Sequence, residues 1–197
     1  MDEIRVIKEA QKGSLAAFNQ LVMAYQGTAY NVAYRVIGNG DAAADACQDA
    51  FLKAYQAIKQ YRGGSFKSWL LRIVTNACYD QLRYKSRRPA TSLEDMTENS
   101  DDHSEKLIDG EERPEELVLR GELNEVIQHG INHLPEDQRV VLVLSDVQGF
   151  SYQEIAEIVD QPLGTVKSRL SRGRQRLRDF LLAQQELLPS QYRLNDE

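Results

Sequence analysis

Residues 151–178 read SYQEIAEIVDQPLGTVKSRLSRGRQRLR, and this segment decides the fold of the rear half of the chain. Ser151 followed by Glu154 predicts a helix start, because both side chains can satisfy backbone groups that a first turn leaves unpaired. The inward face of this helix is expected to hold Ile155, Ala156 and Val159. Pro162 must end it, since proline has no amide hydrogen and disfavours helical backbone at the preceding residue. The same proline suits the first turn of a second helix, so the segment predicts two helices joined by a tight turn.

The second helix of this segment carries an apolar stripe on one side and polar residues on the other. Its predicted buried residues are Val166, Leu170 and Leu177, with Gly173 where a neighbouring group comes close. Its opposite face presents Lys167, Ser168, Ser171, Arg172 and Gln175. Short hydrogen-bonding groups can read base edges in the major groove, while flanking arginines can hold phosphates. The segment therefore indicates a helix-turn-helix that binds duplex DNA.

The density of charge on this helix argues against a helix that is merely solvated and binds nothing. Residues 164–178 hold six basic residues and no acid, a net charge of +6. Cations so crowded repel one another, and a solvated helix would normally intersperse glutamates. If about six phosphates are neutralised, the log–log slope of DNA affinity against salt is expected to be about −5.

Helical periodicity also dominates the front half, and no segment alternates as a strand would. Ser14 is expected to cap a first long helix that ends at Gly38-Asn39-Gly40. Asp41 is expected to cap a second helix, and Ser65 a third helix that runs to about Leu82. The apolar faces of these helices carry, in order, Leu15, Phe18, Leu21, Val22, Tyr25, Ala29, Val32 and Val36; Ala43, Cys47, Ala50, Phe51, Ala54 and Ile58; and Trp69, Leu70, Ile73 and Ala77.

Charge is sorted into blocks along the 197 residues, although the formal total is −6. Residues 62–88 carry a net +6, and residues 94–116 carry a net −9. Residues 90–113 are rich in Ser, Thr, Asp, Glu and Asn without apolar periodicity, which is typical of a flexible, solvated linker. Two basic surfaces joined by an acidic linker are therefore predicted.

The fold class predicted from these patterns is all-α, with two small helical domains. The rear domain is expected to begin with a helix that ends at Leu134-Pro135, followed by a helix that buries Val140, Val143 and Leu144. The predicted division is a front domain at 1–89, an acidic linker at 90–113, a rear domain at 114–183 and a polar tail at 184–197.

Several classes of protein are disfavoured by what the sequence lacks. No run of about 18 apolar residues occurs, so no membrane insertion is expected, and the acidic, amphipathic start does not resemble a signal peptide. Cys47 and Cys78 lack CxxC spacing and are expected to be reduced in a cytoplasmic protein. His129 and His133 lack further ligands, so we expect no metal site and no cofactor. Without a phosphate-binding glycine loop or a paired catalytic nucleophile and base, we expect no enzyme activity.

Aromatic residues alternate with cations near the start of the third front helix. They are Tyr61, Phe66 and Trp69, interleaved with Arg62, Lys67 and Arg72. Unstacked bases gain about 1–3 kcal/mol each by stacking on aromatic rings, so this surface suits a separated DNA strand. The alternative is that the rings belong to the core. Taken alone, the pattern favours the core for Trp69 and leaves Phe66 undecided.

Two groups of motifs resemble one known family. The first group is Asp45-x-x-Gln48-Asp49-x-Phe51-x-Lys53-Ala54-Tyr55 and Tyr61-Arg62-Gly63-Gly64-Ser65-Phe66-x-x-Trp69-Leu70-x-Arg72-Ile73-x-x-Asn76. It resembles region two of the extracytoplasmic-function (ECF) RNA polymerase sigma factors. The second group resembles region four of that family and comprises Leu134-Pro135-x-x-x-Arg139, Gly149-Phe150-Ser151-Tyr152-x-Glu154-Ile155-Ala156 and Gly164-Thr165-Val166-Lys167-Ser168-Arg169. The resemblance covers about residues 5–182 in the expected order, and the short acidic linker also matches.

The resemblance implies a region 2 helical bundle and a region 4 helix-turn-helix in a subunit that directs RNA polymerase to promoters and helps to melt them. It implies site residues by position. For the clamp coiled coil of the polymerase they are Asp45, Gln48, Asp49, Lys53 and Tyr55. For the minus-ten element they are Tyr61, Arg62, Ser65, Phe66, Trp69, Arg72 and Asn76. For the minus-thirty-five element they are Thr165, Lys167, Ser168, Arg169, Ser171 and Arg172, with Arg169 on a phosphate.

One departure from the family pattern affects the minus-ten site. The loop from Gly63 to Phe66 is one residue shorter than the commoner form and contains two flexible glycines. The resemblance therefore leaves open which loop residue captures the flipped base, and with it the minus-ten preference.

The partners implied are core RNA polymerase, through its clamp coiled coil and flap, promoter DNA in duplex and single-stranded form, and an anti-sigma factor. The acidic linker is expected to mimic nucleic acid by its charge. The alternative function is a helix-turn-helix regulator that acts without core polymerase and senses a ligand or partner through its front domain. That alternative explains the rear segment equally well but not the second basic, aromatic-bearing surface.

Overall fold

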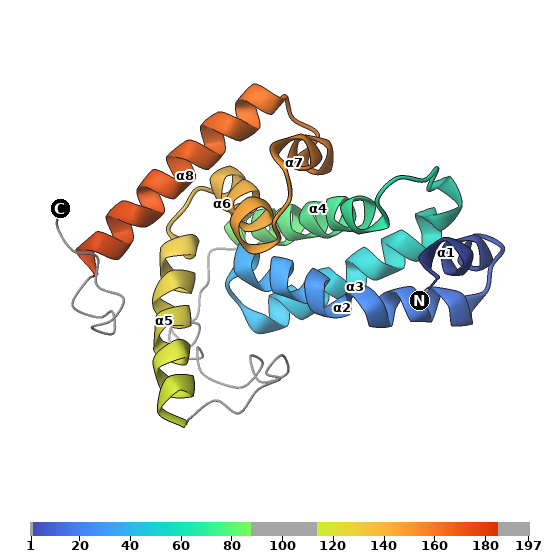
Figure 1. The fold of residues 1–197 in the computed structure, drawn as a ribbon, viewed down its shortest axis with the longest axis horizontal. Helices are drawn as coiled ribbons and strands as arrows, with labels where there is room; N and C mark the ends of the chain where they lie inside the picture. Colours follow the sequence, from blue (N-terminus) through green and yellow to red (C-terminus); the bar gives the residue numbers. More distant parts are fainter. Residues whose placement is uncertain (1, 88–113, 185–197) are drawn as a thin grey trace.

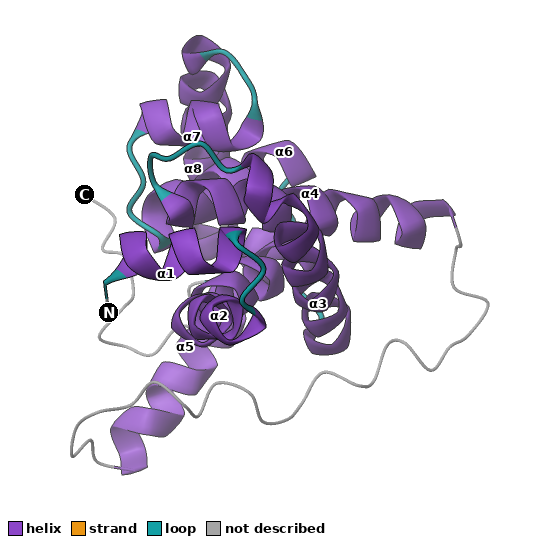
Figure 2. Ribbon diagram, turned by 90° about the vertical axis from the view of Figure 1, so that its right-hand side faces the viewer, coloured by secondary structure: helices purple, strands orange, loops and turns teal. Residues whose placement is uncertain are grey.

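The computed structural model describes residues 2–87 and 114–184, and every element in these two ranges is a helix (Figure 1, Figure 2). The front half contains α1 (Glu3–Gln11), α2 (Leu15–Ile37), α3 (Gly40–Ala57), the 3-10 helix η1 (Ile58–Gln60) and α4 (Phe66–Arg87). The rear half contains α5 (Pro114–Asn132), α6 (Glu136–Leu142), the π-helical turn η3 (Val143–Val147), α7 (Tyr152–Val159) and α8 (Leu163–Ala183). The predicted all-α class is confirmed. The predicted linker and nearly all of the predicted tail lie outside the described residues.

The front helices begin where short polar side chains accept backbone N–H groups. Ser14 Oγ accepts the N–H three residues later at 3.2 Å, and α2 ends at Gly38 with φ +76°, as predicted. The cap of α3 differs from the prediction, which was Asp41. Asn39 Oδ1 accepts the N–H three residues later at 2.9 Å, and Asp41 lies inside the first turn. A carboxylate at that place still interacts favourably with the helix N-terminus, which is why both residues looked suitable from the sequence.

Two further features of the front half differ from the prediction. The acidic start of the chain forms a helix of its own, α1, capped by Asp2. It supports the loop after α3, because Gln11 Nε2 donates to the carbonyl oxygens of Ile58 at 3.1 Å and Tyr61 at 2.8 Å. At the other end, α4 continues to Arg87 instead of stopping near residue 82.

The helix-turn-helix forms as the sequence indicates, with small changes of register. The capping box is present: the Ser151 N–H donates to Glu154 Oε2 at 2.9 Å, and the Glu154 N–H donates back to Ser151 Oγ at 3.3 Å. Asp160, at φ +52°, makes the turn after α7. Pro162 is the residue just before α8, not its first helical residue.

The buried face of α7 also differs from the prediction. Ile155 is fully buried as predicted, but the second fully buried position is Ile158, whereas Ala156 and Val159 are only partly buried. In the front half, Leu15 is 58% exposed although its spacing placed it on the apolar stripe. Leu15 and Val159 are the terminal residues of their helices, where fewer neighbouring elements cover the side chains.

The two cysteines, Cys47 on α3 and Cys78 on α4, are buried and unbonded. Burial raises the pKa of each thiol to about 12, because the thiolate is poorly solvated there. Both side chains therefore act as small apolar groups.

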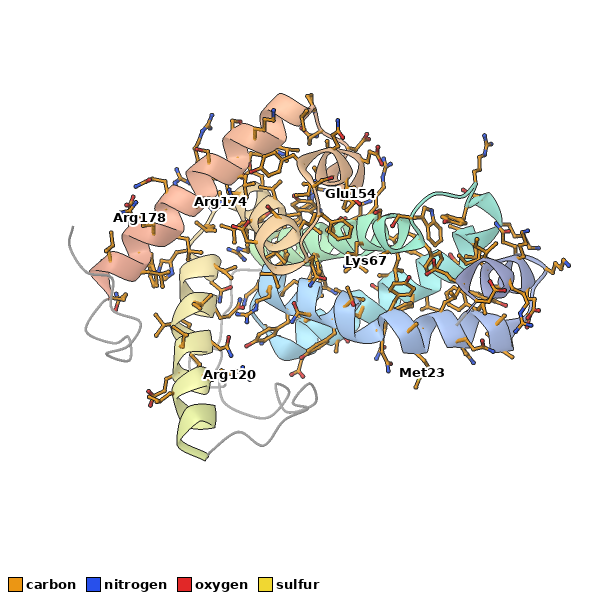
Figure 3. The ribbon with its side chains drawn as sticks, in the orientation of Figure 1. Met23, Lys67, Arg120, Glu154, Arg174 and Arg178 are labelled. Atoms are coloured by element: carbon orange, nitrogen blue, oxygen red, sulfur yellow. The ribbon has the colours of Figure 1, made fainter. Side chains whose placement is uncertain are left out.

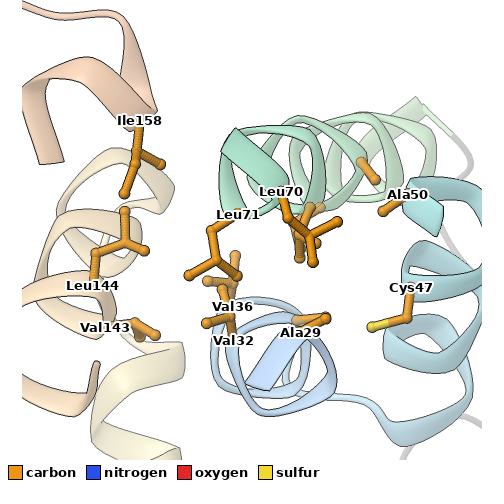
Figure 4. Packing of buried hydrophobic residues seen from close by; sticks show 14 of the residues in the cluster. Ala29, Val32, Val36, Cys47, Ala50, Leu70, Leu71, Val143, Leu144 and Ile158 are labelled. Atoms are coloured by element: carbon orange, nitrogen blue, oxygen red, sulfur yellow. The ribbon is translucent and has the colours of Figure 1, made fainter. Parts of the chain in front are cut away.

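The front and rear halves pack against each other. Figure 4 shows Val143, Leu144 and Ile158 of the rear half facing Leu71 of α4 and the valines of α2. These side chains are at most 2% exposed. Polar groups flank the apolar contact: Arg139 donates from Nη1 to the Val36 carbonyl oxygen at 2.6 Å, which satisfies a free carbonyl at the end of α2.

Candidate polymerase and promoter interface

The outer face of α8 presents polar and cationic side chains to solvent. Lys167, Ser171 and Arg172 are exposed; Lys167 and Ser171 lie one turn apart on one side of the helix, and Arg172 points to the adjacent side. Thr165 and Ser168 are half-buried, and Ser168 Oγ donates to the Thr165 carbonyl oxygen at 3.0 Å. The first three residues are thus free to meet a ligand, while Thr165 and Ser168 lie closer to the core of the rear domain.

Acids from distant parts of the chain neutralise two of the six bases of α8. Arg169 Nε lies 2.9 Å from Asp137 Oδ2 of α6, so the residue expected on a phosphate is half-buried and ion-paired. Arg174 pairs with Asp146 of η3 at 2.6 Å. Within the described ranges, no carboxylate pairs with the remaining four, which are Lys167, Arg172, Arg176 and Arg178. Fewer bases of α8 are therefore available to DNA than the net charge of +6 over residues 164–178 suggested.

A groove follows this face of α8. It is lined by Tyr152, Lys167, Ser171, Arg174, Gln175 and Arg178. Figure 3 shows Arg174 and Arg178 on the same helix, one turn apart. Tyr152, Arg174 and Arg178 were missing from the sequence-based site, although the helical period that selected Lys167 and Ser171 also places Arg174 and Arg178 on this side.

The residues expected at the polymerase clamp share the outer face of α3. Asp45, Gln48, Asp49, Lys53 and Tyr55 are all exposed. Lys53 Nζ lies 3.4 Å from Asp80 Oδ2 of α4, with both side chains more than half exposed. Such an exposed pair contributes little to stability. Sequence reasoning missed Leu52, which is 61% exposed in the middle of this polar face. The sequence did contain a signal for it, because Leu52 is an apolar residue on the same helical face as Asp49 and Lys53.

The loop expected at the minus-ten element is held by glycine conformations and by one hydrogen bond. Gly63 and Gly64 have φ values of +103° and +93°, which residues with a side chain rarely adopt. Tyr61 Oη donates to the Gly64 carbonyl oxygen at 2.8 Å. Ser65 Oγ accepts the N–H of Ser68 at 3.1 Å and so caps α4, as its position predicted. Arg62, between these contacts, is exposed.

Phe66 lies in the core and not on the surface. It is 2% exposed, and its ring centroid lies 5.4 to 5.6 Å from those of Tyr25, Tyr61 and Trp69. In this conformation Phe66 cannot meet a base. Trp69 is half-buried, so one part of its indole belongs to this aromatic cluster and another part reaches the surface.

The remaining minus-ten residues lie along one face of α4. Arg72 and Asn76 are exposed on the side where Trp69 emerges. Arg72 Nη2 lies 3.2 Å from Asp160 Oδ2, in the turn of the helix-turn-helix. Nearby, Lys67 Nζ lies 4.7 Å from the centre of the Phe150 ring. Two cations of the front surface therefore contact the rear half directly.

Metal-binding geometry is not found in the described ranges, where no group of three or more His, Cys, Asp or Glu residues could hold an ion. In the same ranges, no helix is long and apolar enough to cross a membrane.

Family models match both halves of the chain. The model for Sigma-70 region 2 matches residues 21–88, and the model for Sigma-70, region 4 matches residues 124–177. These ranges contain the α3 and α4 surfaces in the first case and the helix-turn-helix in the second.

Relatives match over most of the chain. The ECF RNA polymerase sigma-E factor of Escherichia coli is 39% identical over 171 residues, which cover 86% of this chain and 89% of that one. The RNA polymerase sigma-H factor of Pseudomonas aeruginosa is 37% identical over 175 residues, covering 87% and 89%.

Two solved structures share the arrangement of the helices. CnrH in complex with the cytosolic domain of CnrY has a TM-score of 0.65 at 27% identity, covering 92% of this chain and 97% of that one. The sigma factor RpoE of Bartonella quintana, in complex with the anti-sigma factor NepR, has a TM-score of 0.61 at 28% identity, covering 83% and 96%. The chain therefore belongs to the ECF group of the sigma-70 family, the sigma factors that direct transcription initiation with core RNA polymerase.

Proposed function

We propose that the chain reads a promoter at two points with two domains, residues 1–89 and residues 114–183. The rear domain binds the duplex minus-thirty-five element through the outer face of α8. The observation that carries this assignment is the exposed set Lys167, Ser171 and Arg172, whose two cations have no acidic partner in the described part of the chain. Because two of the four bases of α8 without a carboxylate partner also face base edges, four phosphates are the upper limit, and the salt slope is then no steeper than about −3.6. That slope is shallower than the −5 expected from six.

The front domain binds core polymerase through α3. Asp45, Gln48, Asp49 and Lys53 surround the exposed side chain of Leu52. An apolar centre with a polar rim is the usual composition of a protein–protein contact. Asp49→Ala or Leu52→Ala is therefore expected to weaken association with core polymerase, while DNA binding by the rear domain is retained.

The same domain holds the separated strand of the minus-ten element along α4. Trp69 offers a partly exposed ring for stacking, and Arg72 and Asn76 offer polar contacts along the same face. Extrusion of a base costs a few kcal/mol, which these contacts offset. Phe66 supports Trp69 from the core side.

Promoter binding requires the two domains to separate from the arrangement seen here. The two elements are named for positions 25 base pairs apart, which is about 85 Å of B-form DNA. In this structure Arg72 and the turn of the helix-turn-helix are only 3.2 Å apart, at the Asp160 carboxylate. The arrangement seen here is thus a closed state that cannot hold both elements.

Spin labels at positions 56 and 153, both exposed, test this separation by pulsed electron paramagnetic resonance. The distance is expected to be short and narrowly distributed in the free chain, and much longer with core polymerase and promoter DNA. Asp160→Asn keeps a residue that tolerates positive φ but removes the ion pair. It is expected to raise the open population by about two- to fivefold. An equally long distance in the free chain would contradict the closed state.

We also propose an anti-sigma factor as a partner of this chain. Support comes from the similar RpoE structure, which is a complex with the anti-sigma factor NepR. The chain has no catalytic role in this scheme and works in the cytoplasm, where its polymerase is.

Run-off transcription with core polymerase on genomic fragments tests the function as a whole. The chain is expected to start transcripts at sites that share an upstream element, and the free chain is expected to bind the same fragments only weakly. Tight binding by the free chain, with no transcripts from the mixture, would instead support the regulator that acts without polymerase.

A further inference from the structure

A single arginine connects α8 to the two elements that precede it. Arg174 Nε and Nη2 donate to the two carboxylate oxygens of Asp146 at 3.0 and 2.6 Å. Nη2 also reaches Ser145 Oγ at 3.3 Å, and Nη1 reaches Tyr152 Oη at 3.4 Å. Ser145 and Asp146 belong to η3, and Tyr152 opens α7.

The pairing leaves little of the guanidinium for another partner. An arginine has five N–H donors, and Arg174 uses four of them in these hydrogen bonds. Two parallel bonds to one carboxylate fix both direction and distance, which a lysine cannot reproduce. Accordingly, the Arg174 hydrogen bonds hold the pKa of the Asp146 carboxyl below its usual value.

Helical spacing places Arg174 on the side of α8 that carries Lys167 and Ser171. It follows Lys167 by two turns and Ser171 by about one, and it lines the same groove. Its guanidinium, however, is held against Asp146 of η3, although the side chain is 48% exposed. The tilt of a recognition helix determines which of its side chains reach base edges, and a π-helical turn is a local irregularity that often occurs at functional sites.

We propose that Arg174 is a positioning residue for promoter reading: it fixes α8 against η3 and α7 so that Lys167, Ser171 and Arg172 face the bases. This inference rests on the proposed function of α8. In this proposal Arg174 and Asp146 determine how accurately α8 reads the bases, and Arg174 contacts no phosphate.

Three variants in the holoenzyme, Arg174→Ala, Arg174→Lys and Asp146→Asn, separate positioning from phosphate binding. The probe is a promoter fragment obtained from the run-off experiment, with its upstream element randomised. All three variants are expected to weaken binding by about tenfold, the value of one well-placed base contact, and to flatten base preference in the upstream element. The salt slope is expected to stay unchanged, and the double variant Arg174→Ala/Asp146→Asn is expected to be no worse than either single variant.

The opposite results would overturn the inference. If Arg174 holds a phosphate, then removing the Asp146 charge strengthens binding, Arg174→Lys is nearly neutral, and Arg174→Ala lowers the steepness of the salt dependence by about 0.9. A purely structural role would weaken binding to all sequences equally and leave base preference intact, which would also overturn it.

Arg178→Ala is the matched control, one turn further along α8 and without a carboxylate partner in the described ranges. It is expected to lower the steepness of the salt dependence by about 0.9 and to leave base preference unchanged. If a single variant unfolds the rear domain, the charge-exchanged pair Arg174→Asp/Asp146→Arg is measured instead. It should recover part of the base preference, and no recovery counts against the inference. Failure of the unaltered holoenzyme to prefer any upstream sequence would refute the proposed function itself.

Discussion

Replacing Phe66 tests whether its ring supports the minus-ten surface from the core or captures a base. The side chain is 2% exposed and contacts the rings of Tyr25, Tyr61 and Trp69. Truncation of a buried phenylalanine to alanine costs about 3–5 kcal/mol, because buried surface and ring contacts are lost and a cavity remains. Phe66→Leu keeps most of the volume and is expected to cost about 1–1.5 kcal/mol.

Urea unfolding measures these changes directly. Trp69 is the single tryptophan of the chain and lies against Phe66, so its fluorescence reports the unfolding of this region. With a slope of about 2 kcal/mol per molar urea, Phe66→Ala is expected to lower the midpoint by about 2 M. Phe66→Leu is expected to lower it by about 0.6 M and to retain promoter melting in run-off transcription.

Asn76→Ala is the control on the same helix, because Asn76 is exposed and its removal is expected to change the midpoint little. A supporting role of Phe66 in the core is refuted if Phe66→Ala leaves the midpoint unchanged, yet abolishes transcription from a duplex template while a premelted template is still transcribed. That result would make Phe66 a base contact that becomes exposed in the open complex.

The exposed surfaces, the caps and the Arg174–Asp146 pair can each be tested by a single substitution. Arg172→Ala is expected to weaken binding to the upstream element by about 1–3 kcal/mol and to relax sequence choice, measured by competition binding of the holoenzyme. Asp49→Ala is expected to impair co-purification with core polymerase without changing the urea midpoint, since the residue is exposed; equal loss of rear-domain DNA binding would contradict the assignment. Ser151→Ala removes the two hydrogen bonds made by Ser151 Oγ, to the N–H and to Oε2 of Glu154, and is expected to cost about 1 kcal/mol in unfolding free energy. Because Arg174 lowers the pKa of Asp146 in the folded chain, their pairing stabilises above the ordinary carboxyl pKa and is lost as the pH falls through the lowered value. The difference in urea midpoint between the unaltered chain and Asp146→Asn should therefore be full above about pH 5 and shrink toward pH 2.

Local signals in the sequence were sufficient for much of the fold. The capping box at Ser151 and Glu154, the cap at Ser14 and the stop at Gly38 formed as expected, because each depends on backbone groups within about four residues. The same holds for the exposed polar face of α3, since helical period alone separates it from the buried alanines.

Contacts between residues far apart in the sequence could not be predicted in this way. Asp137 and Asp146 neutralise Arg169 and Arg174 across 28 to 32 residues of sequence, so an apparently uniform basic block is divided into paired and available cations. Whether Phe66 is core or surface depended on Tyr25, which reaches it from another helix.

The sequence by itself therefore determined the all-α class, the places where most helices start and stop, the basic face of α8 and the membership suggested by its motifs. These follow from periodicity, capping and side-chain chemistry, which act over one or two helical turns. Only the tertiary structure decided which charges are free, which aromatic ring is buried, and that Arg72 meets Asp160 when the two halves close. The reason is physical: a charge or a ring acquires its environment from whatever packs against it, and packing joins residues that no local pattern relates.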